Sequence, residues 1–168
     1  MSFWDIFKNS ENKSNYHNDL HQKVASLLPL EDEKEHILIA CIAGLMARVA
    51  YVDFRVCENE EAIIEKSLKT WTKLNNEEVA AVKKLALEEI NSLAGLENHL
   101  YCHPLNEILN NDQKFELLEA LFALAAGDGE VEQKESEEIR LITKGLILEP
   151  KYFAAARATV IEHLKSLK

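Results

Sequence analysis

The sequence predicts an all-α protein, a single bundle of about seven to eight helices that contains an internal repeat of a helix pair. Glycine and proline contribute only 5 and 3 of the 168 residues, so the chain has few residues that favour turns or break helices. Apolar residues recur every three to four positions along most of the chain, which is the spacing of one helix face. No segment alternates apolar and polar residues for long enough to indicate a β-strand.

The first half of the chain is predicted to contain four helices. Residues 1–16 are expected to form a loose N-terminal arm, and one domain is expected to span residues 17–168. The first helix ends near Leu28, because the residue before Pro29 is disfavoured in the helical region. The next three are expected from Glu31 or Asp32 to about Tyr51, along the stripe Ile64, Leu68 and Trp71, and from 75–78 to Gly95.

The second half is predicted to contain four more helices. Pro104 suits the first position of a short helix that is capped near His103. Asn111 or Asp112 is expected to cap the next helix, which the glycines of residues 127–129 interrupt. Two further helices are striped by apolar residues: Ile139, Ile142 and Leu146 in one, and Phe153, Ala156, Val160, Leu164 and Leu167 after Pro150 in the other.

The two halves repeat each other at an offset of 75 residues. Both contain the pattern A-x-x-D-x-x-V-x-x-x-E-x-x-x-I, at the same place relative to the two most apolar helices. The matched residues are Ala50, Asp53, Val56, Glu60 and Ile64 in the first copy, and Ala125, Asp128, Val131, Glu135 and Ile139 in the second. We therefore expect two duplicated helix pairs, over about 37–74 and 112–146, each with an acidic corner.

The second acidic corner resembles the second half of an EF-hand loop. Asp128, Glu132 and Glu135, with the carbonyl of Glu130, could bind calcium, magnesium or manganese, because these cations prefer oxygen ligands. Apolar residues occupy the places of the first two EF-hand ligands, so a standard EF-hand is excluded. The alternative is an Asp cap and a Glu near a helix start, without an ion.

In the first copy the corresponding acidic residues are Asp53 and Glu60. Phe54 replaces the turn glycine, and Arg55 could pair with either acid, so an ion-free corner is favoured there.

These segments resemble the TerB-like tellurite-resistance family. The resemblance rests on 45–53 with Glu60, and on 121–131 with Glu135. It implies an all-α bundle with internal two-fold repetition, acidic corners that could hold divalent cations, and a stress-response role, including tellurite resistance, exercised through binding. The family also includes the N-terminal part of membrane-anchored DnaJ-type co-chaperones, but this sequence has no H-P-D triplet.

Charge and composition restrict the partners. The net charge of −10 disfavours nucleic acid and favours protein partners with basic surfaces. No apolar run is long enough to span a membrane, no signal peptide is evident, and the three cysteines form no C-x-x-C pair, so a cytoplasmic protein is expected. An exposed patch around Phe3 and Trp4 would favour a homodimer, and the oligomeric state stays open.

Other chemistry-bearing residues give weak signals for catalysis. His17 with His21, and His99 with His103 near Cys102, have the spacing of a metal-binding helix face, but surface histidines are the simpler interpretation. Only one E-x-x-H motif occurs, so a di-metal carboxylate oxidase is excluded. We predict a non-enzymatic TerB-like binding or scaffold protein. The alternatives are a metal-dependent enzyme that combines the acidic corner with a nearby His, and a metal-free acidic adaptor.

Overall fold

The computed structural model describes residues 23–29, 32–52, 56–92 and 99–161, without the side chains of residues 89–92, 99, 100 and 128. Besides the helical residues 23–27, this part contains seven α-helices and one short 3-10 helix, and no β-strand, so the all-α prediction is confirmed. The helices are α3 (Glu33–Ala50), α4 (Glu58–Trp71), α5 (Asn76–Ser92), α6 (His99–Ile108), α7 (Asn111–Ala125), η1 (Ala126–Asp128), α8 (Gln133–Gly145) and α9 (Pro150–Ala158). The predicted arm over 1–16 lies outside the described residues.

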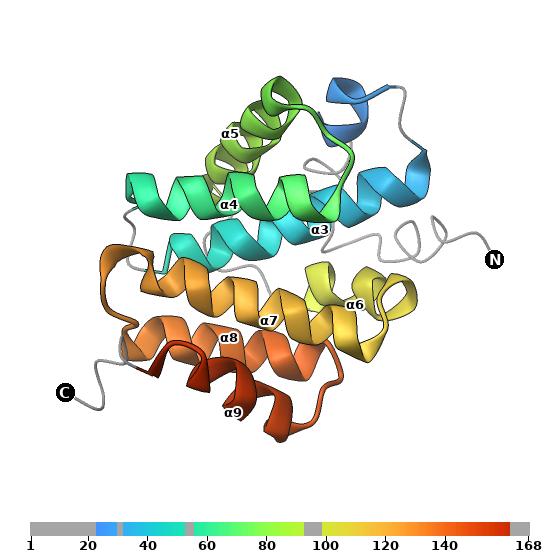
Figure 1. Cartoon of the computed structure of the whole chain (residues 1–168). Coiled ribbons are helices and arrows are strands. Elements are labelled where there is room, and N and C mark those ends of the chain that lie inside the picture. Colours follow the sequence, from blue (N-terminus) through green and yellow to red (C-terminus); the bar gives the residue numbers. More distant parts are fainter. Residues whose placement is uncertain (1–22, 30–31, 53–55, 93–98, 162–168) are drawn as a thin grey trace.

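Helix α3 is the centre of the bundle. It packs against α4, α5, α6, α7 and α8 (Figure 1). Thirteen of its 18 residues are buried, which explains why residues 37–47 contain no charged side chain. None of the helices in the described part combines the length and the apolar character needed to cross a bilayer.

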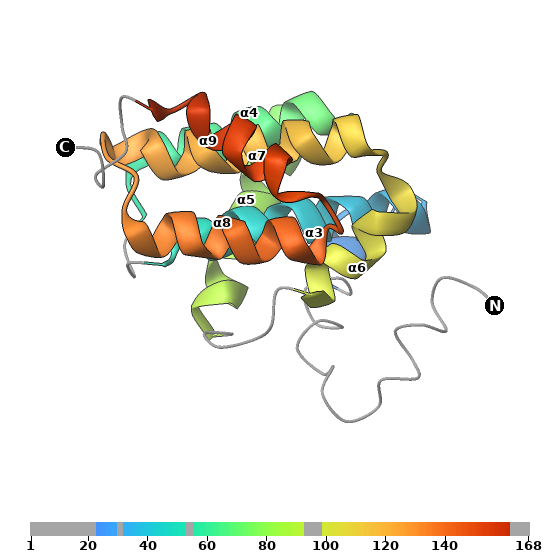
Figure 2. The same cartoon turned by 90° about the horizontal axis from the view of Figure 1, so that it is seen from below.

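The helix pairs α3–α4 and α7–α8 pack against each other across the core. Helix α4 packs on α7 in one layer, and α3 packs on α8 in the other layer (Figure 2). An offset of 75 residues takes the first residue of α4, Glu58, to the first residue of α8, Gln133. Val131 is 2% exposed within the core, and Val56 packs partly buried against the same core. Both halves therefore share one interior.

Side-chain caps fix several helix starts. The carboxylate of Asp32 accepts a hydrogen bond from Glu35 N at 2.8 Å, as expected for the N-cap of α3. The cap of α7 is Asn110, one residue before the predicted pair. Asn110 Oδ1 accepts from Gln113 N at 2.9 Å, and Gln113 Oε1 accepts from Asn110 N at 3.0 Å. The glutamine three positions later completes this capping box, and that sets the boundary.

The prediction that Pro104 begins a short helix was wrong. Helix α6 begins at His99, and Pro104 lies inside it. Proline inside a helix loses a backbone hydrogen bond. Tyr101, Cys102 and Leu105 are 1%, 0% and 0% exposed, so the burial of this helical face outweighs the local cost.

The last helix is shorter than its apolar stripe predicted. Helix α9 ends at Ala158, and Thr159 Oγ1 donates to the carbonyl of Ala156 at 2.6 Å. A threonine that bonds back to the preceding turn competes with continuation of the helix. Leu164 and Leu167 lie outside the described residues, as does Gly95, the predicted stop of α5.

Candidate functional site

The end of α3 and the start of α4 lie at the same end of the bundle as the turn between α7 and α8 (Figure 1). We call residues 51–57, between α3 and α4, the first corner, and residues 126–132, between α7 and α8, the second corner. Asn59 at the start of α4 donates from Nδ2 to the carbonyl of Gly127 at 3.1 Å. A Cβ added at Gly127 would lie 3.2 Å from Cγ of Glu60. The glycine therefore lets the second corner approach the start of α4 closely.

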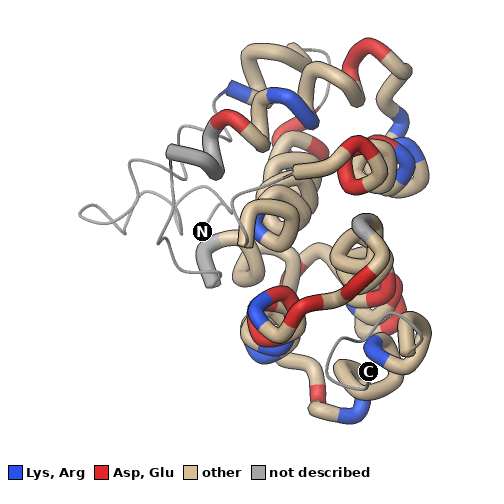
Figure 3. The backbone as a smooth tube through the Cα atoms, turned by 90° about the vertical axis from the view of Figure 1, so that its left-hand side faces the viewer, with Lys and Arg blue, Asp and Glu red and all other residues tan. Residues whose placement is uncertain are grey.

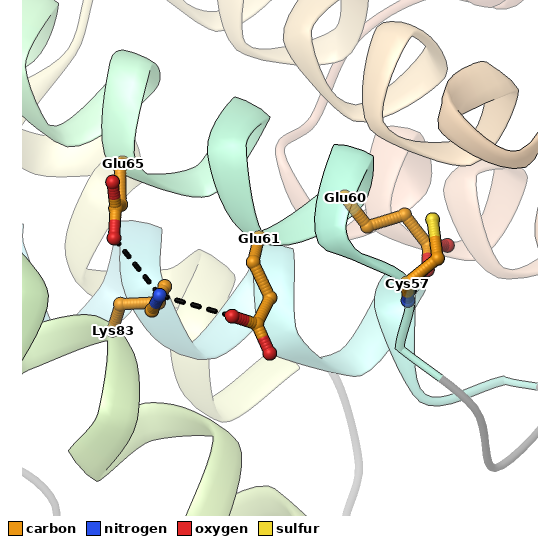
Figure 4. A network of polar contacts seen from close by, with 5 residues as sticks. All are labelled: Cys57, Glu60, Glu61, Glu65 and Lys83. Atoms are coloured by element: carbon orange, nitrogen blue, oxygen red, sulfur yellow. Dashed lines mark hydrogen bonds and ion pairs between the residues drawn. The ribbon is translucent and has the colours of Figure 1, made fainter.

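The buried glutamates that follow the corners cap the helices in the same way. Glu60 Oε2 accepts from the backbone N–H of Cys57 at 2.7 Å, and Glu135 Oε2 accepts from that of Glu132 at 2.8 Å. The two residues are 3% and 2% exposed. Amides at a helix start have no partner within the helix, so each carboxylate stabilises the first turn. The orientation of Glu60 toward Cys57 is visible in Figure 4.

Two further carboxylates of α4 hold α5. Lys83 Nζ on α5 donates to Glu65 at 2.8 Å and to Glu61 at 3.0 Å (Figure 4). The hydrogen bond to Glu65 is the main reason that the pKa of Lys83 lies above its usual value. These acids therefore have a structural partner.

The second corner contains a left-handed turn. Gly129 has φ of 103°, a conformation that side-chain-bearing residues rarely adopt. It follows η1 and directs the chain so that Val131 enters the core, while Glu130 and Glu132 stay half-buried at the surface. The left-handed turn explains why a glycine, Gly129, follows Asp128 in the second copy of the repeated pattern.

The structure brings only part of the predicted cation site into view. Asp53 lies outside the described residues, and the side chain of Asp128 is not described. Glu60 and Glu135 point back to the helix-start amides, while Glu130 and Glu132 remain near the surface. Among the side chains that are described, no group of three or more His, Cys, Asp or Glu could hold a metal ion. The described residues therefore do not form a cation site by themselves.

The two histidines whose side chains are described, His36 and His103, do not join the corners. His103 is exposed on α6, and α6 lies at the opposite end of the bundle from the turn between α7 and α8 (Figure 1). His36, the histidine of the E-x-x-H motif, places Nε2 2.6 Å from the carbonyl of Leu28. His17, His21 and the side chain of His99 lie outside the described part. A site that combines the second corner with His103 is therefore excluded by geometry.

Cys41 and Cys102 are buried thiols. Burial raises the pKa of Cys102 to about 12 and that of Cys41 well above its usual value. A thiol must ionise to act as a nucleophile, so neither residue is suited to nucleophilic catalysis. Both thiols lie in the core of the bundle.

A polar cluster that the sequence did not reveal surrounds the C-terminal end of α8. Lys114 Nζ donates to the carbonyl of Leu146 at 2.9 Å, and Asn106 Nδ2 donates to that of Gly145 at 2.9 Å. Lys114 is 6% exposed, and burial lowers its pKa. The only sequence signal was a charged residue on the apolar side of the predicted α7.

Comparison with known proteins identifies the family. The family model described as "Tellurite resistance protein TerB" matches residues 38–158, which include both corners and the core helices α4 to α9 with most of α3. No curated protein and no solved structure gives a significant match. Because the match covers well over half of the 168 residues, the chain belongs to the TerB tellurite-resistance family.

Proposed function

We propose that this TerB-family protein is a non-enzymatic binding or scaffold protein of a tellurite-resistance type of stress response, located in the cytoplasm. The observation that supports this proposal is that described residues on which the family resemblance rests have structural roles. Glu60 and Glu135 cap helices, and Gly127 lets the second corner pack closely on the start of α4. Because these polar side chains maintain the fold, we expect the protein to act through its surface.

The charge distribution supports protein partners. Seen from the corner end, acidic and basic residues are interspersed on the helices, and Lys and Arg form no continuous stripe along the described chain (Figure 3). The net charge of −10 favours a partner with a basic surface over a phosphate backbone. A homodimer through Phe3 and Trp4 stays a prediction, because both residues lie outside the described part.

A tolerance assay tests the stress role. We expect cells of the source organism that lack this protein to stop growing at a lower tellurite concentration than wild-type cells. The intact gene should restore the wild-type tolerance. Equal tolerance of the deleted and wild-type strains, across a tellurite dilution series, would contradict the proposed role.

The second corner supports one refinement, a divalent cation held by Asp128, Glu132 and Glu135 with the backbone carbonyl of Glu130. Glu130 and Glu132 follow the left-handed turn at Gly129 and remain near solvent, where a cation could reach them. A protein that binds calcium, magnesium or manganese in its folded state should melt at a higher temperature in millimolar cation. The increase should disappear in Glu132→Gln, because this change removes a proposed carboxylate ligand. An unchanged melting temperature with all three cations would leave the metal-free adaptor as the function.

A further inference from the structure

A cavity of about 380 Å³ lies between the start of α3 and the end of α6, away from both corners. Helix α3 has 18 residues, so its start is about 27 Å from the first corner at the usual rise per residue. The described residues that line the cavity are Asp32, Glu33, Lys34, Ile37, Glu107 and Ile108. The cavity belongs to neither corner and is not explained by the capping role of their glutamates.

The cavity has an apolar floor and a charged rim. Ile37 is 1% exposed, and Ile108 packs partly buried against the core. Glu33, Lys34 and Glu107 are exposed around them. The volume is at the low end of the range for ligand sites, so it suits one or two side chains better than a large cofactor.

The rim is acidic, and part of this charge has no partner in the described structure. Asp32 is engaged as the N-cap of α3. The side chains of Glu33 and Glu107 form no ion pair or hydrogen bond with any described residue, and that of Lys34 also forms none. Three carboxylates therefore face one ammonium group around an apolar floor.

Glu107 is also placed against the local electrostatics. It is next to the last residue of α6, where the helix dipole is negative and a cation would be favoured. Glu33, in contrast, lies in the first turn of α3, where the dipole favours an acid. Helix stability therefore accounts for Glu33 but not for Glu107, and an incoming cation would relieve the unfavourable charge.

We propose that this cavity receives an arginine or lysine side chain of a basic protein partner. The aliphatic stem of that side chain would lie on Ile37 and Ile108, and its charge would meet Glu33 and Glu107. Basic side chains commonly bury the stem on apolar surface and keep the charge at the rim. This inference rests on the proposed function as a binding protein, and it assigns the partner chemistry and the binding surface.

A labelled-protein titration tests the proposal. The probe is a short synthetic peptide of alternating leucine and arginine, blocked at both ends, added to the ¹⁵N-labelled full chain. We expect the amide resonances of residues 33–37 and 107–108 to shift most. Glu33→Gln/Glu107→Gln should weaken binding about five-fold, as for the loss of two exposed ion pairs.

The matched control is Glu58→Gln/Glu77→Gln. Both variants change the net charge from −10 to −8, and Glu58 and Glu77 are exposed first-turn acids of other helices. The control should bind like the wild type, and melting curves should show both variants folded. Equal weakening in the two variants, or shifts centred elsewhere, would overturn the proposal.

Two further outcomes separate the possibilities. If Trp4→Ala shifts the resonances of residues 33–37 without peptide, the chain's own N-terminal segment occupies the cavity, and the proposal is overturned. If the peptide binds as expected while deletion of the gene leaves tellurite tolerance unchanged, the stress role fails and the binding site stands. If the peptide does not bind while deletion of the gene lowers tellurite tolerance, the proposed binding site fails and the stress role stands.

Discussion

Helices α3 and α7 are equivalent under the 75-residue offset, but their surroundings differ. Thirteen of the 18 residues of α3 are buried, compared with seven of the 15 residues of α7. We attribute this difference in burial to helix α6, which packs on α3 and on α8. At the offset positions, Cys41 and Gly44 of α3 are buried, whereas Glu116 is exposed and Glu119 is half-buried on α7.

This comparison separates the features that the two halves share from the features that differ between them. The shared features are the helix starts and their capping glutamates, which depend on local geometry. The differing features are side chains that face α6 on one side and solvent on the other. A Cβ on Gly44 would overlap the ring of Tyr101, so the glycine is required by this neighbour. The residue at position 44 therefore depends on its neighbour in the bundle and not on its place in the repeated pattern.

The largest expected effect comes from exchanging the residues of this pair. Gly44→Glu would place a carboxylate against the buried ring of Tyr101, and should lower the free energy of unfolding by about 4 kcal/mol or more. Glu119→Gly should lower it by only about 1 kcal/mol, the helix-propensity cost of glycine. Urea unfolding measures both. Similar losses in the two variants would contradict the difference in environment.

Removal of the capping carboxylates should have the next largest effect, and the loss of stability should be similar in both halves. Glu60→Ala and Glu135→Ala each leave a helix-start amide without its partner and should each destabilise the protein by about 2 kcal/mol. Thermal or urea unfolding of both variants checks this. If one variant lost much more than the other, the two corners would not be structurally equivalent.

The buried thiols of α3 and α6 predict a dependence on alkaline pH. Burial raises the pKa of Cys102 to about 12. Above pH 9 the unfolded thiol ionises while the folded one keeps its proton, so stability falls by about 1.4 kcal/mol per pH unit for this thiol. Cys41 acts in the same direction. Lys114 acts in the opposite one, because its lowered pKa makes stability rise with pH toward 10.5.

Cys102→Ala should therefore reduce the slope of unfolding free energy against pH between pH 9 and 11. Urea unfolding at successive pH values measures this slope. Cys57→Ala is the matched control, since that thiol is only half-buried in the first corner. An unchanged slope in Cys102→Ala would mean that its thiol is not desolvated.

The smallest expected effect concerns the ends of α4 and α8. After α8, Ile147 adopts a left-handed conformation with φ of 54° while 76% exposed, whereas Thr72 after α4 is extended. A β-branched residue is strained there, so Ile147→Asn should raise stability by about 1 kcal/mol. Thr72→Asn should give no gain, because it removes the bond from Thr72 Oγ1 to Leu68. Melting temperatures that fall in Ile147→Asn would contradict the strain.

The sequence predicted the parts of this fold that local patterns determine. The helix starts at Asp32 and Glu149–Pro150 follow from capping and proline preferences, and the interruption at 127–129 follows from glycine. The position of Pro104 inside α6 could not be predicted, because burial of its neighbours decided it. The cluster around Lys114 could not be predicted either, since its acceptors belong to a helix end that is distant in sequence. The repeat units and the cation ligands stay predictions.

That cluster also links the unfolding of distant segments. The carbonyls at the end of α8 are bonded by side chains 39 and 32 positions earlier in the chain, on α6 and α7. Loosening α6 would therefore release the last turn of α8 to amide hydrogen exchange. Together with the crosswise packing, this makes a single cooperative transition the expected behaviour, even though the chain contains two similar halves.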